Sequence, residues 1–226
     1  MLFAFLFAFP SASYADTFTG NTASSTDGLG NFMGEFTYKY FSSTNAVFDV
    51  TLTNTSAISN GGYLTGFVFN NPNNYISGVT LASSNSSFEL LGAQSFNDSV
   101  SASPYGKFDI GAALGGNFLG GGSPLSGIAV NNTATFEFAL SGNNLDQLSV
   151  SSFVGATASS NEFFVARFRG FENGGSDKVP GFYSVPEPST WLLICLGFVG
   201  LMVFRNRQQD VQESELLYKW QRLSEV

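Results

Sequence analysis

Histidine is absent from this sequence, and cysteine occurs once in 226 residues. Without histidine the chain cannot build a Ser-His-Asp or Cys-His nucleophile system, and it cannot hold zinc or haem through imidazole. A single cysteine excludes an intramolecular disulfide, a cysteine-cluster zinc site and an iron–sulfur cluster. We therefore expect no cofactor, and the sequence favours a non-enzymatic protein.

Positive charge is scarce as well. The chain has 9 Lys and Arg against 17 Asp and Glu, which gives a formal net charge of -8. Residues 16–190 contain thirteen acidic and five basic side chains and so account for the whole of this charge. So few cations argue against binding the phosphate backbone of nucleic acid. The sequence predicts an acidic, soluble domain with no nucleic-acid partner.

The first fifteen residues have the pattern of a secretory signal. An apolar run from Leu2 to Phe9 is followed by Pro10 and by a small-residue stretch that ends at Ala15. This order predicts signal cleavage after Ala15. The basic segment that usually comes first is missing, so we interpret residues 1–15 as a signal peptide truncated at its start. Export is predicted.

A second apolar run, Trp191 to Phe204, has no charged residue and is followed at once by Arg205 and Arg207. As a helix, its fourteen residues would rise about 21 Å, against about 30 Å for the hydrocarbon core of a bilayer. We predict a short transmembrane helix with Arg205 and Arg207 as its stop, on the cytoplasmic side. A buried core helix is the alternative.

A proline-rich junction precedes this helix. Pro186 and Pro188 flank Glu187, and they keep the backbone extended with few N–H donors, as suits a peptide in the cleft of a processing enzyme. The motif Pro186-Glu187-Pro188, the apolar helix and the basic stop together resemble the PEP-CTERM sorting signal of exported bacterial proteins, over residues 185–207. The same module is also called the ice-binding protein C-terminal domain, but this name is no evidence for ice binding.

This resemblance implies an exosortase-type processing enzyme as partner. It also implies a single-pass precursor in the inner membrane and a mature form at the cell surface or outside the cell, in contact with exopolysaccharide. One feature departs from the family, because residues 208–226 continue past the basic stop. This cytoplasmic tail places apolar residues on one helical face, namely Leu216, Leu217, Trp220 and Leu223. An amphipathic helix and a solvated tail are both open interpretations.

Residues 16–184 show the two-residue period of β-strands. Phe48, Val50 and Leu52 alternate with polar residues, and residues 134–140 repeat the pattern. Further strands are predicted at 35–41, 63–69, 78–81, 87–92, 106–110, 126–130, 148–154 and 163–171. We expect an all-β fold, an antiparallel β-sandwich or jelly roll of eight to ten strands, with a core of phenylalanine. The glycine-rich segment 111–127 is predicted to be a surface loop.

Candidate binding residues in this domain are few. Glu172 and Asp177 bound an oxygen-rich loop, which makes them weak calcium candidates because the regular acidic spacing of known calcium loops is missing. Tyr63, Tyr75 and Tyr105 could contact a carbohydrate, or could use their hydroxyl groups locally. Arg167 and Arg169 share one face of a strand and are expected to pair with nearby glutamates.

A glycoside hydrolase would need two carboxylates at a defined separation, and nothing in the order of the chain identifies such a pair. No catalytic residue is therefore predicted. The sequence favours an exported, sorted protein of the cell surface or exopolysaccharide matrix. The alternative is a carbohydrate-binding or calcium-dependent adhesive module, and a hydrolase is less favoured.

Overall fold

The structure, a computed structural model, describes residues 15–157 and 162–183. The predicted transmembrane helix at 191–204, the sorting motif, the tail and all of the predicted signal peptide except Ala15 lie outside these residues. The strands, from Asp16 to Tyr183, all belong to one compact unit. Among the described residues, none of the helices is long and apolar enough to cross a membrane.

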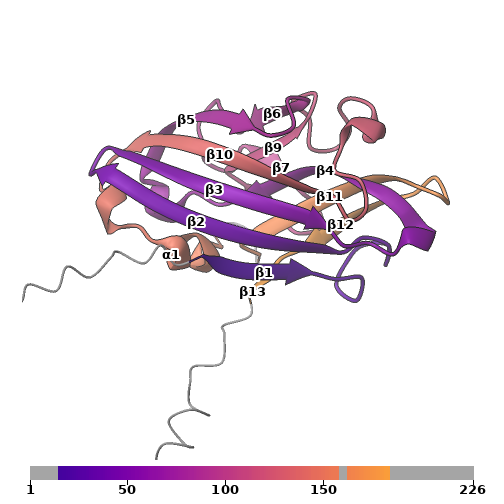
Figure 1. Cartoon of the computed structure of the whole chain (residues 1–226). Coiled ribbons are helices and arrows are strands. Elements are labelled where there is room, and N and C mark those ends of the chain that lie inside the picture. The colour runs from indigo at the N-terminus through magenta and orange to yellow at the C-terminus, as the bar shows by residue number, and fades with distance from the viewer. Residues whose placement is uncertain (1–14, 158–161, 184–226) are drawn as a thin grey trace, which may run out of the picture. The chain divides into compact units, whose positions relative to one another are not determined.

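Two antiparallel sheets form this unit (Figure 1). The first sheet has the strand order β13-β1-β2-β3-β10-β5. Its strands are β1 Asp16–Gly20, β2 Phe32–Ser42, β3 Asn45–Asn54, β5 Ile76–Ser83, β10 Thr133–Gly142 and β13 Phe182–Tyr183. The second sheet has the order β12-β11-β4-β9-β6, formed by β4 Gly61–Phe69, β6 Phe88–Leu91, β9 Ile110–Leu114, β11 Phe164–Phe171 and β12 Ser176–Pro180. A small third sheet pairs β7 Val100–Ser101 with β8 Lys107–Phe108.

Alternating burial explains why the long central strands form. Every second residue of β10 is buried, and the same holds for β3. Cross-strand register brings Phe48 opposite Phe138 and Val50 opposite Phe136, so the apolar side chains of both strands share one face. Aromatic and β-branched pairs of this kind stabilise adjacent strands. The all-β, antiparallel fold class predicted from this period is confirmed.

Phenylalanine fills the space between the two sheets. All twelve of the largest fully buried side chains are phenylalanines. Rings from the first sheet meet rings from the second, with centroid separations of 5.2 Å for Phe48 and Phe69 and 4.7 Å for Phe136 and Phe67. Tilted and edge-on pairs at these separations add about 0.5–1.5 kcal/mol each to the effect of burial. The unit is therefore a β-sandwich with one aromatic core.

The outer face of the second sheet is covered as well. A separate apolar cluster lies there, and it brings together residues of the sheet, such as Val68 and Val165, with residues of the overlying loops, such as Val100 and Phe118. Strand β9 is buried along its whole length for this reason. The loops that cover this face are residues 92–108, which include β7 and β8, and residues 115–123.

Two strand predictions are wrong. Residues 148–154 form helix α1 Val150–Gly155 in place of a strand. Ser149 and Ser152 make a capping box, and Val150 and Phe153, three residues apart, are the buried positions. Residues 126–130 form the end of a 3-10 turn, η3 Pro124–Ser126, and one isolated bridge from Ile128 to Leu64.

Two further expectations need correction. The glycine-rich segment 111–127 begins as buried strand, because Gly111 to Leu114 belong to β9, and only its later part is loop. The small side chains there let β9 lie between neighbouring strands and under the loops. The described residues contain thirteen strands where eight to ten were expected, and the unforeseen ones are β1, β7, β9, β12 and β13. The remaining 3-10 turns are η1 Ile58–Asn60, η2 Pro72–Asn74 and η4 Leu145–Gln147.

Candidate functional site

The sorting residues predicted from the sequence, Pro186, Glu187, Pro188, Arg205 and Arg207, lie outside the described residues. Ala15 is described and exposed, and it directly precedes β1. Strand β13, the last of the domain, ends at Tyr183. The folded domain therefore begins and ends within a few residues of the two predicted processing points.

Asp177, a weak calcium candidate, is buried and fully occupied by protein donors. Its Oδ1 accepts hydrogen bonds from Thr26 Oγ1 and the Asp27 N–H, both at 2.9 Å. Its Oδ2 accepts from the N–H groups of Leu29 at 2.8 Å and Gly30 at 2.9 Å. Asp177 thus holds the loop between β1 and β2 against β12.

Electrostatics at Asp177 follow from these contacts. Burial alone would raise the pKa of this carboxyl, but the N–H groups of Gly30, Leu29 and Asp27 stabilise the ionised form. The net effect is a pKa below the ordinary value. Glu172, the other calcium candidate, is exposed, and no group of three or more acidic side chains fit to hold a metal occurs in the described part of the chain.

Two of the residues singled out in the sequence, Tyr105 and Arg169, bind backbone carbonyl groups. The Tyr105 hydroxyl donates to the Ser24 carbonyl at 2.6 Å. Arg169 donates from Nη1 to the Gly121 carbonyl at 2.7 Å and from Nη2 to the Gly122 carbonyl at 3.0 Å, in place of the glutamate partner expected. Arg169 thereby fixes the glycine-rich loop over the second sheet.

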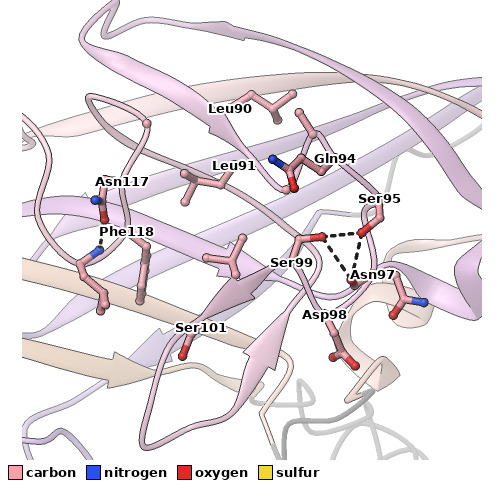
Figure 2. Close-up of a pocket in the computed structure, with 15 residues that line it drawn as sticks. Leu90, Leu91, Gln94, Ser95, Asn97, Asp98, Ser99, Ser101, Asn117 and Phe118 are labelled. Atoms are coloured by element: carbon pink, nitrogen blue, oxygen red, sulfur yellow. Dashed lines mark hydrogen bonds between the residues drawn. The ribbon is translucent and has the colours of Figure 1, made fainter.

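A pocket of about 530 Å³ lies among the loops on the outer face of the second sheet (Figure 2). Residues 90–95, 97–101 and 116–119 line it, and we call it the loop pocket. In Figure 2, Asn117 and Phe118 are on one side of it, and Gln94, Ser95 and Ser99 are on the other.

The lining of the loop pocket is polar and nearly neutral. It offers the hydroxyl groups and amides of Gln94, Ser95, Ser99, Ser101 and Asn117. No lysine, arginine or tyrosine belongs to the lining, and the carboxylates there are limited to that of Asp98. The apolar residues beneath are largely inaccessible, with exposures of 6% for Leu91, 9% for Val100 and 4% for Phe118.

A buried carboxyl holds one rim of the loop pocket in place. Asp109 is 1% exposed and accepts from the Asn71 N–H at 2.7 Å and from the Asp98 N–H at 2.6 Å. Burial raises the pKa of Asp109, and the nearby Asp98 charge raises it further. The two N–H groups lower the pKa, but the net effect is a pKa above the ordinary value. The Asn71 amide in turn donates to the carbonyls of Ile76 and Phe96, at 2.8 and 3.1 Å.

The rim itself has an unusual backbone. Phe96 and Asp98 both adopt left-handed conformations, with φ of 49° and 48°. A bulky residue such as Phe pays a conformational cost there, and surrounding contacts must enforce it. Gly92 starts the turn at φ 88°, where an added Cβ would lie 1.9 Å from the Asp109 carbonyl oxygen, so only glycine fits.

The opposite wall is fixed by local bonds. Asn117 Oδ1 accepts from the N–H groups of Leu119 at 2.9 Å and Gly120 at 3.3 Å. Together with the Arg169 bonds, these contacts give the glycine-rich loop a defined shape. Sequence reasoning missed this pocket because serine, asparagine and glutamine in loops carry no periodic signal. The glycine-rich segment 111–127 predicts a loop, but nothing in the sequence connects it with residues 90–101 on the other side of the pocket.

Comparison with known proteins bears on the C-terminal part of the chain. Residues 184–208 match the PEP-CTERM protein-sorting motif. This motif marks an exported protein that exosortase targets and whose precursor is held in the membrane at its C-terminal end. The match begins one residue after β13. No curated protein and no solved structure is similar enough to the chain to count as a match.

Proposed function

We propose that this chain is a non-enzymatic exported protein whose β-sandwich is delivered to the cell surface or exopolysaccharide matrix after processing at Pro186-Glu187-Pro188. The observation that carries the proposal is the position of the motif. Strand β13 ends at Tyr183 and the motif match begins at 184, so a cut within the motif leaves every described strand in the released part.

The N-terminal side supports the same proposal. Strand β1 begins at Asp16, directly after the predicted cleavage residue Ala15. Removal of residues 1–15 therefore leaves all described strands of the sandwich in place. In this proposal the helix 191–204 stops the precursor in the inner membrane, with Arg205 and Arg207 on the cytoplasmic side.

The non-enzymatic part of the proposal has two supports. The sequence contains no histidine. Within residues 15–157 and 162–183, the buried acidic side chains are Asp109 and Asp177, and both use their oxygens to hold backbone N–H groups, which is a structural role. The alternative, a carbohydrate-binding module, is favoured by the loop pocket and is developed below.

The sorting proposal is tested by replacing Pro186, Glu187 and Pro188 together with alanine in the native host. The mature wild-type protein should have the mass of a fragment that runs from Asp16 to near Pro188. It should occur in the outer or extracellular fraction. The triple variant should keep residues through Val226 and stay in the inner membrane.

A matched control changes a proline and a glutamate outside the motif, with Pro124→Ala and Glu172→Ala, and should mature as the wild type does. Normal maturation of the triple variant would show that the motif is not used. A wild-type mass that includes Val226, in the inner membrane, would make this a permanently anchored single-pass protein. Attention would then turn to the tail at 208–226.

A further inference from the structure

We propose that the loop pocket is a binding site for neutral sugar residues of a polysaccharide. The site lies wholly within the described β-sandwich, so the inference holds whether or not the sorting motif is processed. Its volume of about 530 Å³ falls in the range of about 300–1,000 Å³ that is usual for small-molecule sites.

The lining argues against other classes of ligand. An anion would need a cation, and no lysine or arginine lines the pocket. A metal ion would need several carboxylates, and Asp98 supplies the one that lines it. A planar aromatic ligand would need an exposed ring to stack on, and Phe118, the aromatic residue of the lining, is 4% exposed. A neutral ligand rich in hydrogen-bonding groups remains.

Sugar hydroxyl groups suit the groups that the pocket offers. Each hydroxyl can donate and accept at once, as a serine hydroxyl can, and primary amides supply both donors and acceptors. The side chains of Gln94 and Ser101 have no hydrogen-bond partner among residues 15–157 and 162–183, although both line the pocket. Because Asn117 Oδ1 already accepts two backbone bonds, its Nδ2 is turned to the other side and can donate.

An apolar contact is also present at the wall. Leu119 lines the pocket and is 53% exposed, so part of its apolar surface is available to a ligand. A sugar ring has one face of C–H groups that can bury such a side chain, and apolar area removed from water is favourable. The pocket thus combines several polar groups with one small apolar patch, as a sugar requires.

The pocket is held in shape before any ligand arrives. Asp109 and Asn71 fix the left-handed rim at Phe96 and Asp98. Ser95 and Ser99 hydroxyls lie 2.8 Å apart, and both donate to the Asn97 carbonyl, as Figure 2 shows. A rigid site pays little ordering entropy on binding, which matters for weakly bound ligands such as sugars.

The test is a calorimetric titration of the full-length chain, held in a detergent without a sugar head group. The probes are neutral tetrasaccharides of glucose, mannose, galactose and N-acetylglucosamine, and tetragalacturonate as an anionic probe. We expect saturable binding of at least one neutral probe and weaker binding of tetragalacturonate, since Asp98 and the net charge of -8 repel it.

Substitutions then place the site. Gln94→Leu and Ser101→Ala should each weaken binding about threefold to tenfold, the equivalent of one lost hydrogen bond, and the double variant should multiply the effects. Neither side chain bonds to the described part of the protein, so the urea unfolding midpoints should match the wild type. The controls Gln147→Leu and Ser43→Ala change exposed residues outside the lining and should leave binding unaltered.

Three outcomes would overturn the proposal. The first is that no neutral probe saturates the protein at concentrations on the order of 10 mM. The second is unchanged affinity in the double variant, which would place binding elsewhere. The third is tighter binding of tetragalacturonate than of every neutral probe. None of these results depends on how residues 184–208 are processed, so failure here and failure of the sorting proposal remain distinct.

Discussion

Asp177→Asn replaces one carboxylate oxygen with an NH₂ group and tests the role of this buried anion. Asp177 accepts four hydrogen bonds, two at each oxygen, from Thr26, Asp27, Leu29 and Gly30. Asparagine keeps one acceptor oxygen, so two donors lose their partner. An unsatisfied buried donor costs about 1–3 kcal/mol, and the expected loss of stability at pH 7 is therefore about 2–5 kcal/mol.

The pH dependence of this loss has a fixed sign. The pKa of Asp177 is lowered from 3.8 by its N–H partners against the opposing effect of burial. A lowered folded-state pKa means that the stabilisation is complete above the unfolded pKa and is lost as the pH falls through the folded value. The difference between wild type and Asp177→Asn should thus be constant from pH 7 to about pH 5 and should shrink below pH 4.

Urea unfolding of residues 16–184, followed by the far-ultraviolet circular dichroism of the β-sheets, measures this difference. Asp146→Asn is the matched control, because Asp146 is exposed in η4, and it should change stability by less than about 0.5 kcal/mol. A loss under 1 kcal/mol at pH 7, or a difference that stays the same down to pH 3, would refute the reasoning about the Asp177 network.

Two more substitutions test the core and the pocket rim. Phe153→Ala should cost about 3–5 kcal/mol, because this ring is fully buried and stacks on Phe48 at 3.8 Å; a loss below 1 kcal/mol in urea unfolding would contradict the packing described. Asp109→Asn should change the pH dependence of stability in the direction opposite to Asp177→Asn. Burial raises the pKa of Asp109 above 3.8, so ionisation of this carboxyl destabilises the folded state. The wild type should therefore lose stability relative to Asp109→Asn as the pH rises from 3 to 7, and a gain over that range would count against this assignment.

The sequence was most informative where one face of a strand is buried and the other is not. Phe48, Val50 and Leu52 alternate with polar residues, and β3 has that burial pattern. The signal fails in β9, which is buried on both faces and reads as a run of small and apolar residues. It also misled at α1, where residues 148–154 were predicted to form a strand while Val150 and Phe153, three residues apart, are the buried pair.

The candidate site was harder to foresee, because its parts are joined by long-range contacts. Asp177 was noticed for its own loop, yet its partners Thr26 to Gly30 lie about 150 residues earlier in the chain. No local pattern connects a single aspartate to a distant turn. The loop pocket depends in the same way on Asp109, whose two bonds set the rim, and on Arg169, whose bonds set the wall.

The pairing of β1 with β13 has a consequence for the order in which the domain is completed. Phe18 lies opposite Tyr183, so the first strand of the sandwich finishes its hydrogen bonds with the last. Such a pairing closes a loop that spans nearly the whole domain, and its contacts cannot form until residue 183 is available. A chain that crosses a membrane from its N-terminal end would therefore keep this edge of the sheet open until its final strand emerged. The sorting motif follows this strand directly in sequence, so the strand that completes the sheet edge would emerge just ahead of the motif.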